Sequence, residues 1–429
     1  MTSHFEDMND LSRRRFMESV AKGCLGVSVM PAMGAFANAA APPIAGQAKH
    51  LIYLFMQGAM SHLDTFDTKP GAPTQGETKT IASSVPGIKI SGYLPGLAKR
   101  MNQLAVIRSM TTETGAHEKG EYLMRTSYKA IGSIVHPFMG SWLHKVKGKL
   151  NKDLPGSVLI GGVNRHPGAG YLEADFSPAP VGSAASGLQN TRPPGYMKND
   201  DKLLKERLRL AKRFESGFWK KYKNREVRAY LDYYNEAVKL LNSKDLSAFD
   251  IKKEKEAVRK TYGENVVGQG CLLARRLVQK KVRCVEVAFG GWDNHRDVFT
   301  ALPAKCEQLD KAVCALLDDL NRTGMIKDTM VVIGTEFGRT PKINQNAGRD
   351  HHPGAFSCVL AGAGIKGGIA YGKTDSKGQS VDDNPVYPAD LNATIATALG
   401  LPIKQEFLSP TNRPFKIAHD GDVVKEVLA

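Results

Sequence analysis

Four short segments of the sequence carry acidic side chains together with histidine or arginine. They lie at residues 61–67, 290–297, 336–341 and 348–353. Converging Asp, Glu and His side chains favour a divalent metal of intermediate softness, such as zinc or manganese, or calcium if carboxylates dominate. Each segment alone has an ordinary explanation, because lone histidines are commonly hydrogen-bonded and aspartates commonly cap helices. Together they favour a metal site. Their candidate side chains are Asp64, Asp293, His295, Glu336, Asp350 and His351.

Strands alternating with helices must position these segments. Apolar, β-branched runs predict strands at residues 51–56, 104–107, 157–160, 282–289, 330–335 and 356–361. Apolar spacing predicts a helix over 309–320, ended by Gly324, and a second helix over 389–399. This alternation predicts an α/β fold with a mostly parallel central sheet and helices on both faces.

Three of the four segments come soon after predicted strands: residues 61–67 after the first strand, 290–297 after the fourth and 336–341 after the fifth. Loops beyond the carboxyl ends of parallel strands form the ligand crevice of such sheets. We therefore expect these three segments to meet at one edge of the sheet. The fourth segment precedes the sixth strand, and we expect it to reach the same edge.

The N-terminus predicts export. Residues 12–17 resemble a twin-arginine signal, and a mildly apolar stretch follows before small residues at 35–39. A basic amphipathic helix is the alternative, but the glycines and Pro31 argue against it. We predict a signal peptide over 1–39 and a mature periplasmic domain over 40–429, exported by the twin-arginine machinery without stable membrane insertion. Cleavage removes Cys24, and we expect the remaining cysteines to be buried thiols.

The chain is basic, with 59 Lys and Arg against 43 Asp and Glu and a formal net charge of +16. Such a balance favours polyanionic partners. Residues 201–260 hold 18 of the basic and 10 of the acidic residues, with aromatic residues interleaved. We expect a basic helical insertion over about 201–262, with a docking surface for an acidic polymer as the alternative. Export and the lack of a docking motif disfavour nucleic acid.

The motifs closely resemble one family. The export signal occurs together with Ser-x-x-Asp-Thr-Phe-Asp from Ser61, Gly-Gly-Trp-Asp-x-His from Gly290, Glu-Phe-Gly-Arg-Thr-Pro from Glu336 and Gly-Arg-Asp-His from Gly348. This combination resembles the exported family called domain of unknown function 1501, which is placed near the alkaline phosphatase and sulfatase superfamily. The resemblance spans nearly the whole mature chain and implies an alkaline-phosphatase-like domain. It also implies metal-centred hydrolysis of phosphate or sulfate esters.

The resemblance carries over residue by residue. Asp293 and His295 look like the superfamily's Asp/His metal pair, His351 like its late single His ligand, and Glu336 occupies the position of an Asp ligand. The segment from His117 looks like the sulfatase nucleophile helix, with His117 where sulfatases place their modified cysteine.

This sequence also departs from the superfamily pattern. Phe337 follows Glu336 where a histidine is expected, and Asp293 and His295 are two positions apart rather than four. No Ser, Thr or Cys stands at the nucleophile position, and Gln57 replaces an acidic residue. The departures leave open whether the site has one metal or none.

Two functions follow from these patterns. The first is a periplasmic metallohydrolase of sulfate or phosphate esters, acting on an anionic glycan or on a small ester substrate. In it the metal activates water, or His117 attacks directly, while Arg339 or Arg349 holds the anionic group. The alternative is a catalytically degenerate member that binds anionic polymer or assists surface assembly.

Overall fold

The computed structural model describes residues 47–162, 164–188 and 243–429, with residues 206, 209–210 and 239–241 between them. The predicted signal peptide lies outside the described residues, as does most of the predicted basic insertion. The described residues belong to one compact unit. None of the helices described is both long and apolar enough to cross a membrane.

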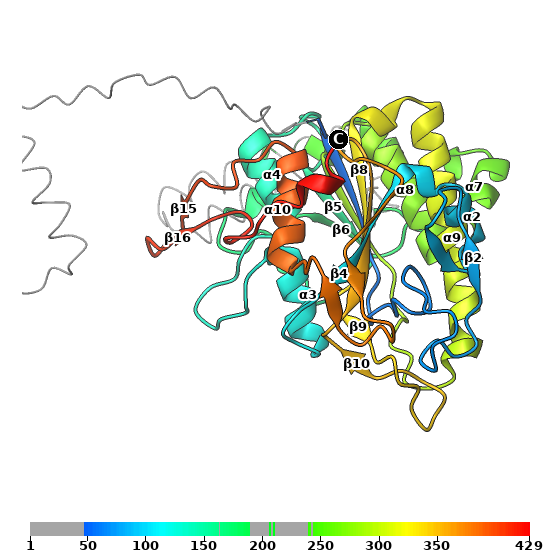
Figure 1. Ribbon diagram of the computed structural model, residues 1–429. Coiled ribbons are helices and arrows are strands. Elements are labelled where there is room, and N and C mark those ends of the chain that lie inside the picture. The colour runs from blue at the N-terminus through cyan, green and yellow to red at the C-terminus, as the bar shows by residue number, and fades with distance from the viewer. Residues whose placement is uncertain (1–46, 163, 189–205, 207–208, 211–238, 242) are drawn as a thin grey trace, which may run out of the picture. The chain divides into compact units, whose positions relative to one another are not determined.

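The core of the fold is an eight-stranded sheet (Figure 1). From one edge to the other its strands are β12 (Ile369–Tyr371), β4 (Leu104–Met110), β11 (Phe356–Gly362), β8 (Thr329–Gly334), β1 (His50–Phe55), β7 (Cys284–Ala288), β5 (Ser157–Ile160) and β6 (Ala179–Val181). The pairing is parallel throughout except at β11, which is antiparallel to both β8 and β4. The structure therefore confirms the mostly parallel sheet and all six predicted strands.

The central strands are buried along their whole length. Every residue of β1 is buried, and β1 pairs in parallel with β7 on one side and β8 on the other. A strand with both faces covered needs apolar side chains on both, which explains its continuous apolar run in place of an alternating pattern.

The direction of strand β11 determines where the chain segment before it lies. Because it runs in the opposite direction, it begins at the edge where β1, β7 and β8 end.

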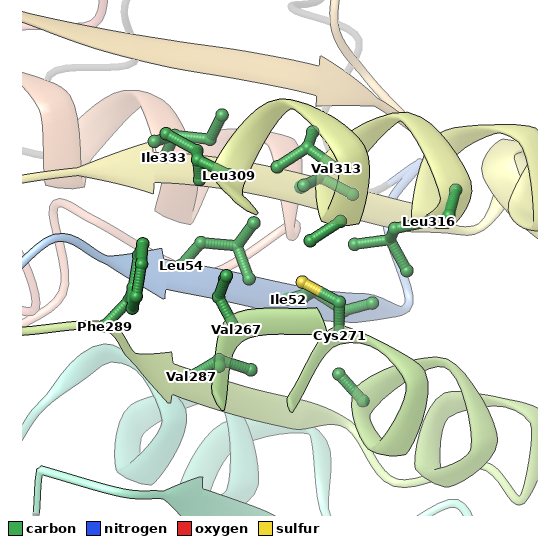
Figure 2. Packing of buried hydrophobic residues seen from close by; sticks show 14 of the residues in the cluster. Ile52, Leu54, Val267, Cys271, Val287, Phe289, Leu309, Val313, Leu316 and Ile333 are labelled. Atoms are coloured by element: carbon green, nitrogen blue, oxygen red, sulfur yellow. The ribbon is translucent and has the colours of Figure 1, made fainter. Parts of the chain in front are cut away.

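One face of the sheet is covered by α2 (Pro95–Lys99), α7 (Glu256–Tyr262), α8 (Val266–Gln279) and α9 (Val298–Arg322) (Figure 1). Figure 2 shows Ile52 and Leu54 of β1 between the side chains of α8 and those of α9. The predicted helix over 309–320 is thus the C-terminal half of α9, whose buried apolar residues recur every three or four positions. Gly324, with φ of 73°, follows its end.

The opposite face is covered by α3 (His117–Thr126), α4 (Met139–Lys147) and α10 (Pro388–Ala398) (Figure 1). Helix α10 is the second predicted helix, and it begins at Pro388, where a missing N–H costs nothing. The five described cysteines are free and buried, as expected.

The remaining elements are short. The paired strands outside the sheet are β2 (Thr80–Ala82) with β3 (Lys89–Ser91), β9 (Gly338–Arg339) with β10 (His351–His352), β13 (Lys373–Thr374) with β14 (Val381–Asp383), and β15 (Phe407–Leu408) with β16 (Pro414–Phe415). The 3-10 turns are η1 (Met101–Gln103), η2 (Ala174–Phe176), η4 (Lys244–Phe249), η5 (Ile251–Lys253), η6 (Met325–Lys327) and η7 (Lys425–Val427).

Candidate metal centre

The candidate centre lies at the carboxyl edge of the parallel strands. Asp293 and His295 follow β7, and Glu336 follows β8. His351 is the first residue of β10, which pairs with β9, two residues beyond Glu336. The reversal of β11 brings the segment before it to this same edge. His117 is the first residue of α3, the helix that packs on the opposite face of the sheet from α8 and α9.

Three histidines of this group are held in the same way, through Nδ1. His117 Nδ1 lies 2.8 Å from Oε1 of Glu336, and His295 Nδ1 lies 2.7 Å from Oδ1 of Asp350. His351 Nδ1 lies 2.7 Å from the carbonyl oxygen of Gly115. Each partner is an acceptor, so each Nδ1 carries a proton, and in the neutral ring Nε2 then presents a lone pair. Carboxylates and backbone carbonyls hold metal-binding histidines in this manner.

The three Nε2 atoms converge on the carboxylate of Asp293. Oδ1 of Asp293 lies 2.9 Å from His295 Nε2 and 3.2 Å from His351 Nε2, and Oδ2 lies 3.4 Å from His117 Nε2. The Nε2 atoms of His295 and His351 are 3.0 Å apart. Two lone pairs at that distance repel each other, so the pair needs a shared proton or a cation between them.

The described residues also offer no hydrogen-bond partner to the buried Nε2 of His117. One ligand atom from each of His117, Asp293 and His351 fits within 4.8 Å of the others. An orphaned imidazole nitrogen beside two others and a carboxylate is a donor set that fits a divalent metal.

The charges around the centre favour an ionised carboxylate. Although burial raises the pKa of Asp293, the hydrogen bond and charge of Arg339, with His117 and His295, bring that pKa down to about 2. The hydrogen bond from His117 to Glu336 raises the pKa of His117. Glu336 is fully buried, and it also accepts the Gly58 N–H at 2.7 Å. Asp293 is therefore ready to bind a cation at neutral pH.

The Arg339 side chain is buried next to Asp293. It is 1 % exposed, and its Nε donates to the Ala59 carbonyl at 2.9 Å while Nη1 donates to the Arg349 carbonyl at 3.1 Å. Nη2 donates to the Gly58 carbonyl and to Asp293 Oδ1. With its donors directed at protein atoms, Arg339 positions Asp293, a geometry that does not suit the anion-binding role expected from the sequence.

Asp64 and Arg349 are not brought into the centre. They form a fully buried ion pair, with Arg349 Nε donating to Asp64 Oδ2 at 2.8 Å. Ser61 and Thr78 donate to the same carboxylate, at 2.5 Å each. The other guanidinium donors of Arg349 reach Asp64 Oδ1 and backbone carbonyls of residues 74, 75, 340 and 341. This pair ties the loops together behind the site.

Of the other predicted site residues, Asp293, His295 and His351 face one another. Glu336 and Asp350 instead accept hydrogen bonds from Nδ1 of His117 and His295. His117, expected as a catalytic group, presents Nε2 to the same carboxylate as the other two histidines. The role of the Gly115 carbonyl has no sequence signal, because every residue supplies a backbone carbonyl.

The family model for a protein of unknown function, DUF1501, matches residues 48–428. The chain therefore belongs to this family, as the motifs predicted. No curated protein matches it significantly.

Similar solved structures include members of the alkaline phosphatase and sulfatase superfamily. One is the lipoteichoic acid synthase LtaP from Listeria monocytogenes, with 10 % identity over 85 % of this chain and 75 % of that chain and a TM-score of 0.40. A second is the PsFucS1 sulfatase from Pseudoalteromonas sp., with 14 % identity over 89 % and 72 % and a TM-score of 0.38. A third is alkaline phosphatase from the Antarctic bacterium TAB5, with 12 % identity over 82 % and 98 % and a TM-score of 0.35.

Proposed function

We propose that this protein is a metal-dependent hydrolase of phosphate or sulfate esters, exported to the periplasm and acting on an anionic glycan. One observation carries the proposal. Three histidines, each fixed through Nδ1, direct Nε2 at one ionised carboxylate. Imidazoles whose Nδ1 atoms are held by carboxylates or backbone carbonyls, with their Nε2 atoms grouped around one carboxylate, have the arrangement of metal-binding histidines.

The residues that would hold the metal are His117, His351 and Asp293, whose ligand atoms lie within 4.8 Å of one another, with His295 beside them. Imidazole nitrogens with one carboxylate suit zinc, and to a lesser degree manganese, whereas calcium takes oxygen ligands. Such an ion, when bound, polarises an ester oxygen and lowers the pKa of a water molecule. Glu336 and Asp350 keep the imidazoles oriented, and Arg339 keeps Asp293 in place.

This assignment changes the role of His117. Its Nε2 faces Asp293 and its Nδ1 is committed to Glu336. One lone pair cannot both bind a metal and attack an ester, so we assign His117 as a ligand and water as the nucleophile.

The anionic group of the substrate needs cations other than Arg339 and Arg349. Arg296 directly follows His295 and is exposed. Lys305 Nζ lies 2.7 Å from the Gly290 carbonyl, in the loop that carries Asp293. We propose these two cations as the binding groups, and the net charge of +16 as the source of long-range attraction.

Elemental analysis of the purified mature protein tests the metal directly. We expect about one equivalent in wild type and a loss in His351→Ala. His352→Ala is the matched control, since the neighbouring His352 bonds the Gln379 carbonyl instead. A screen of aryl phosphates and sulfates then tests turnover. Metal-free protein that takes up no added zinc or manganese would refute the hydrolase.

A catalytically degenerate anion-binding protein is the second candidate. Within the described part of the chain, no Ser, Thr or Cys side chain hydrogen-bonds to the three histidines or to Asp293. This candidate predicts salt-sensitive binding to sulfated polymer without ester cleavage. Cleavage of any ester that is lost in His351→Ala would exclude it.

Export is supported by the residues at 12–17 and 35–39. Replacing both Arg13 and Arg14 by Lys should leave the uncleaved protein in the cytoplasm, as measured by cell fractionation. Unchanged processing would refute this route.

A further inference from the structure

A second cavity lies away from the metal centre. It has a volume of about 460 Å³, within the range of small-ligand pockets. Its walls come from the end of α3, the following segment up to His136, the first residues of α10, and the region of β16. We call it the aromatic pocket, and its rings are those of Tyr128, His136, Tyr387, Phe415 and His419.

The rings of the aromatic pocket are mutually fixed. Tyr128 stacks on His136 with centroids 4.2 Å apart and an angle of 4°. The Phe415 ring meets His136 edge-on at 4.8 Å, and His419 meets Tyr128 at 4.7 Å. The side chain of His419 is 52 % exposed and Tyr387 is 54 % exposed. Rigid rings on the inside and exposed rings at the rim form a ready platform for a flat ligand.

His136 adds one specific polar atom. The Tyr122 hydroxyl accepts the backbone N–H of His136 at 2.7 Å, so its own proton is directed at His136 Nδ1, 2.8 Å away. Burial, and then the charge of His419, lowers the pKa of His136 to about 4. The neutral ring therefore carries its proton on Nε2. That buried atom, on a residue 1 % exposed, has no partner among the residues described.

We propose that the aromatic pocket binds a sugar ring of the glycan, a subsite separate from the reacting ester. A sugar stacks its C–H face on aromatic rings while oxygens at its edge accept hydrogen bonds, which satisfies both the rings and the orphan Nε2–H. A purely aliphatic occupant would leave that donor buried and unpaired. The rim ion pair of Lys129 with Glu113, 2.7 Å apart, offers further partners for hydroxyl groups.

The aromatic pocket and the metal centre share one stretch of chain. Glu113 lines the pocket, Gly115 holds His351, and α3 begins with His117 and reaches the pocket at Leu123. Six helical residues span about 9 Å along the helix axis, a length that an oligosaccharide can reach across. The inference rests on the proposed function, because it assigns this subsite to the same substrate.

Glycan arrays carrying neutral, sulfated and phosphorylated oligosaccharides test the subsite. The proteins compared are wild type, the double variant Tyr387→Ala/His419→Ala, and the control Val266→Ala, another exposed residue, on α8. We expect wild type and control to bind anionic glycans, and the double variant to bind at least tenfold more weakly. Its metal content and its turnover of 4-nitrophenyl esters, which are too small to span both places, should be unchanged.

Binding of no glycan by wild type, or equal binding by the double variant, would overturn the subsite. The two proposals can fail separately. Ester cleavage with unaltered glycan binding in the double variant would refute the subsite alone. Glycan binding that depends on Tyr387 and His419, without cleavage of any ester, would refute the hydrolase alone.

Discussion

The candidate metal centre and the Asp64–Arg349 pair come from similar sequence segments, yet their polar atoms differ in how fully they are hydrogen-bonded. The oxygens of Asp64 accept from Arg349, Ser61 and Thr78, and both members of the pair are fully buried. At the candidate metal centre the Asp293 side chain is 45 % exposed and accepts a hydrogen bond from Arg339. Among the described residues, the His117 Nε2 atom that faces it has no hydrogen-bond partner. A saturated cluster holds loops in place, whereas an unsaturated one is available for a ligand.

The largest effect is expected from breaking the saturated cluster. Arg349→Met leaves the Asp64 carboxylate buried and unpaired, which should cost about 3–5 kcal/mol of unfolding free energy. Chemical denaturation would measure this cost. The double variant Arg349→Met/Asp64→Leu should recover most of the loss, because no charge is left buried. A single variant within about 1 kcal/mol of wild type would mean that the pair is not structural.

The next largest effect, on metal affinity, is expected from the carboxylates that hydrogen-bond Nδ1 of the histidines. Glu336→Gln removes the charge that holds His117, and we expect metal affinity to fall about 10- to 100-fold with the fold intact. Competition with a chelator would measure it. Glu118→Gln is the control, since Glu118 is next to His117 in sequence but its side chain is 74 % exposed. Equal affinities in both variants would refute the role of Glu336.

Lowering the pH should reduce the free energy of unfolding through His62. Burial lowers the pKa of His62 to about 4, although the nearby Asp67 opposes this shift. The unfolded chain, with a histidine pKa near 6.5, therefore binds more protons between pH 6.5 and 4. Stability should fall as pH falls through that window, by up to about 1.4 kcal/mol per unit from this residue. His62→Gln should flatten the slope in pH-dependent melts, and an unaltered slope would contradict the account.

The smallest effect concerns the exposed cation beside the centre. Arg296→Ala should raise KM for an anionic ester about fivefold, equivalent to about 1 kcal/mol, with kcat little changed. The difference should shrink at high salt. Arg322→Ala, at the far end of α9, serves as the exposed control. Identical KM values in the two variants would remove Arg296 from substrate binding.

Much of the fold could be predicted from the sequence because its strands are short buried runs with both faces covered. The direction of β11 could not be read from its own residues, since an apolar strand looks the same in either direction. Separating Asp64 from Asp293 was also out of reach. The partner of Asp64 is Arg349, 285 positions away, and only the folded chain places them together. The role of His117 depended likewise on the orientation of its ring.

X-ray absorption of zinc-loaded protein tests the central claim most directly. The account predicts one tightly held zinc with imidazole nitrogens at about 2.0–2.1 Å and a carboxylate oxygen, and fewer imidazoles in His351→Ala. The His352→Ala control should give the wild-type spectrum. A shell of oxygen atoms only, or zinc that is lost on gel filtration, would contradict the claim that these histidines form a metal centre.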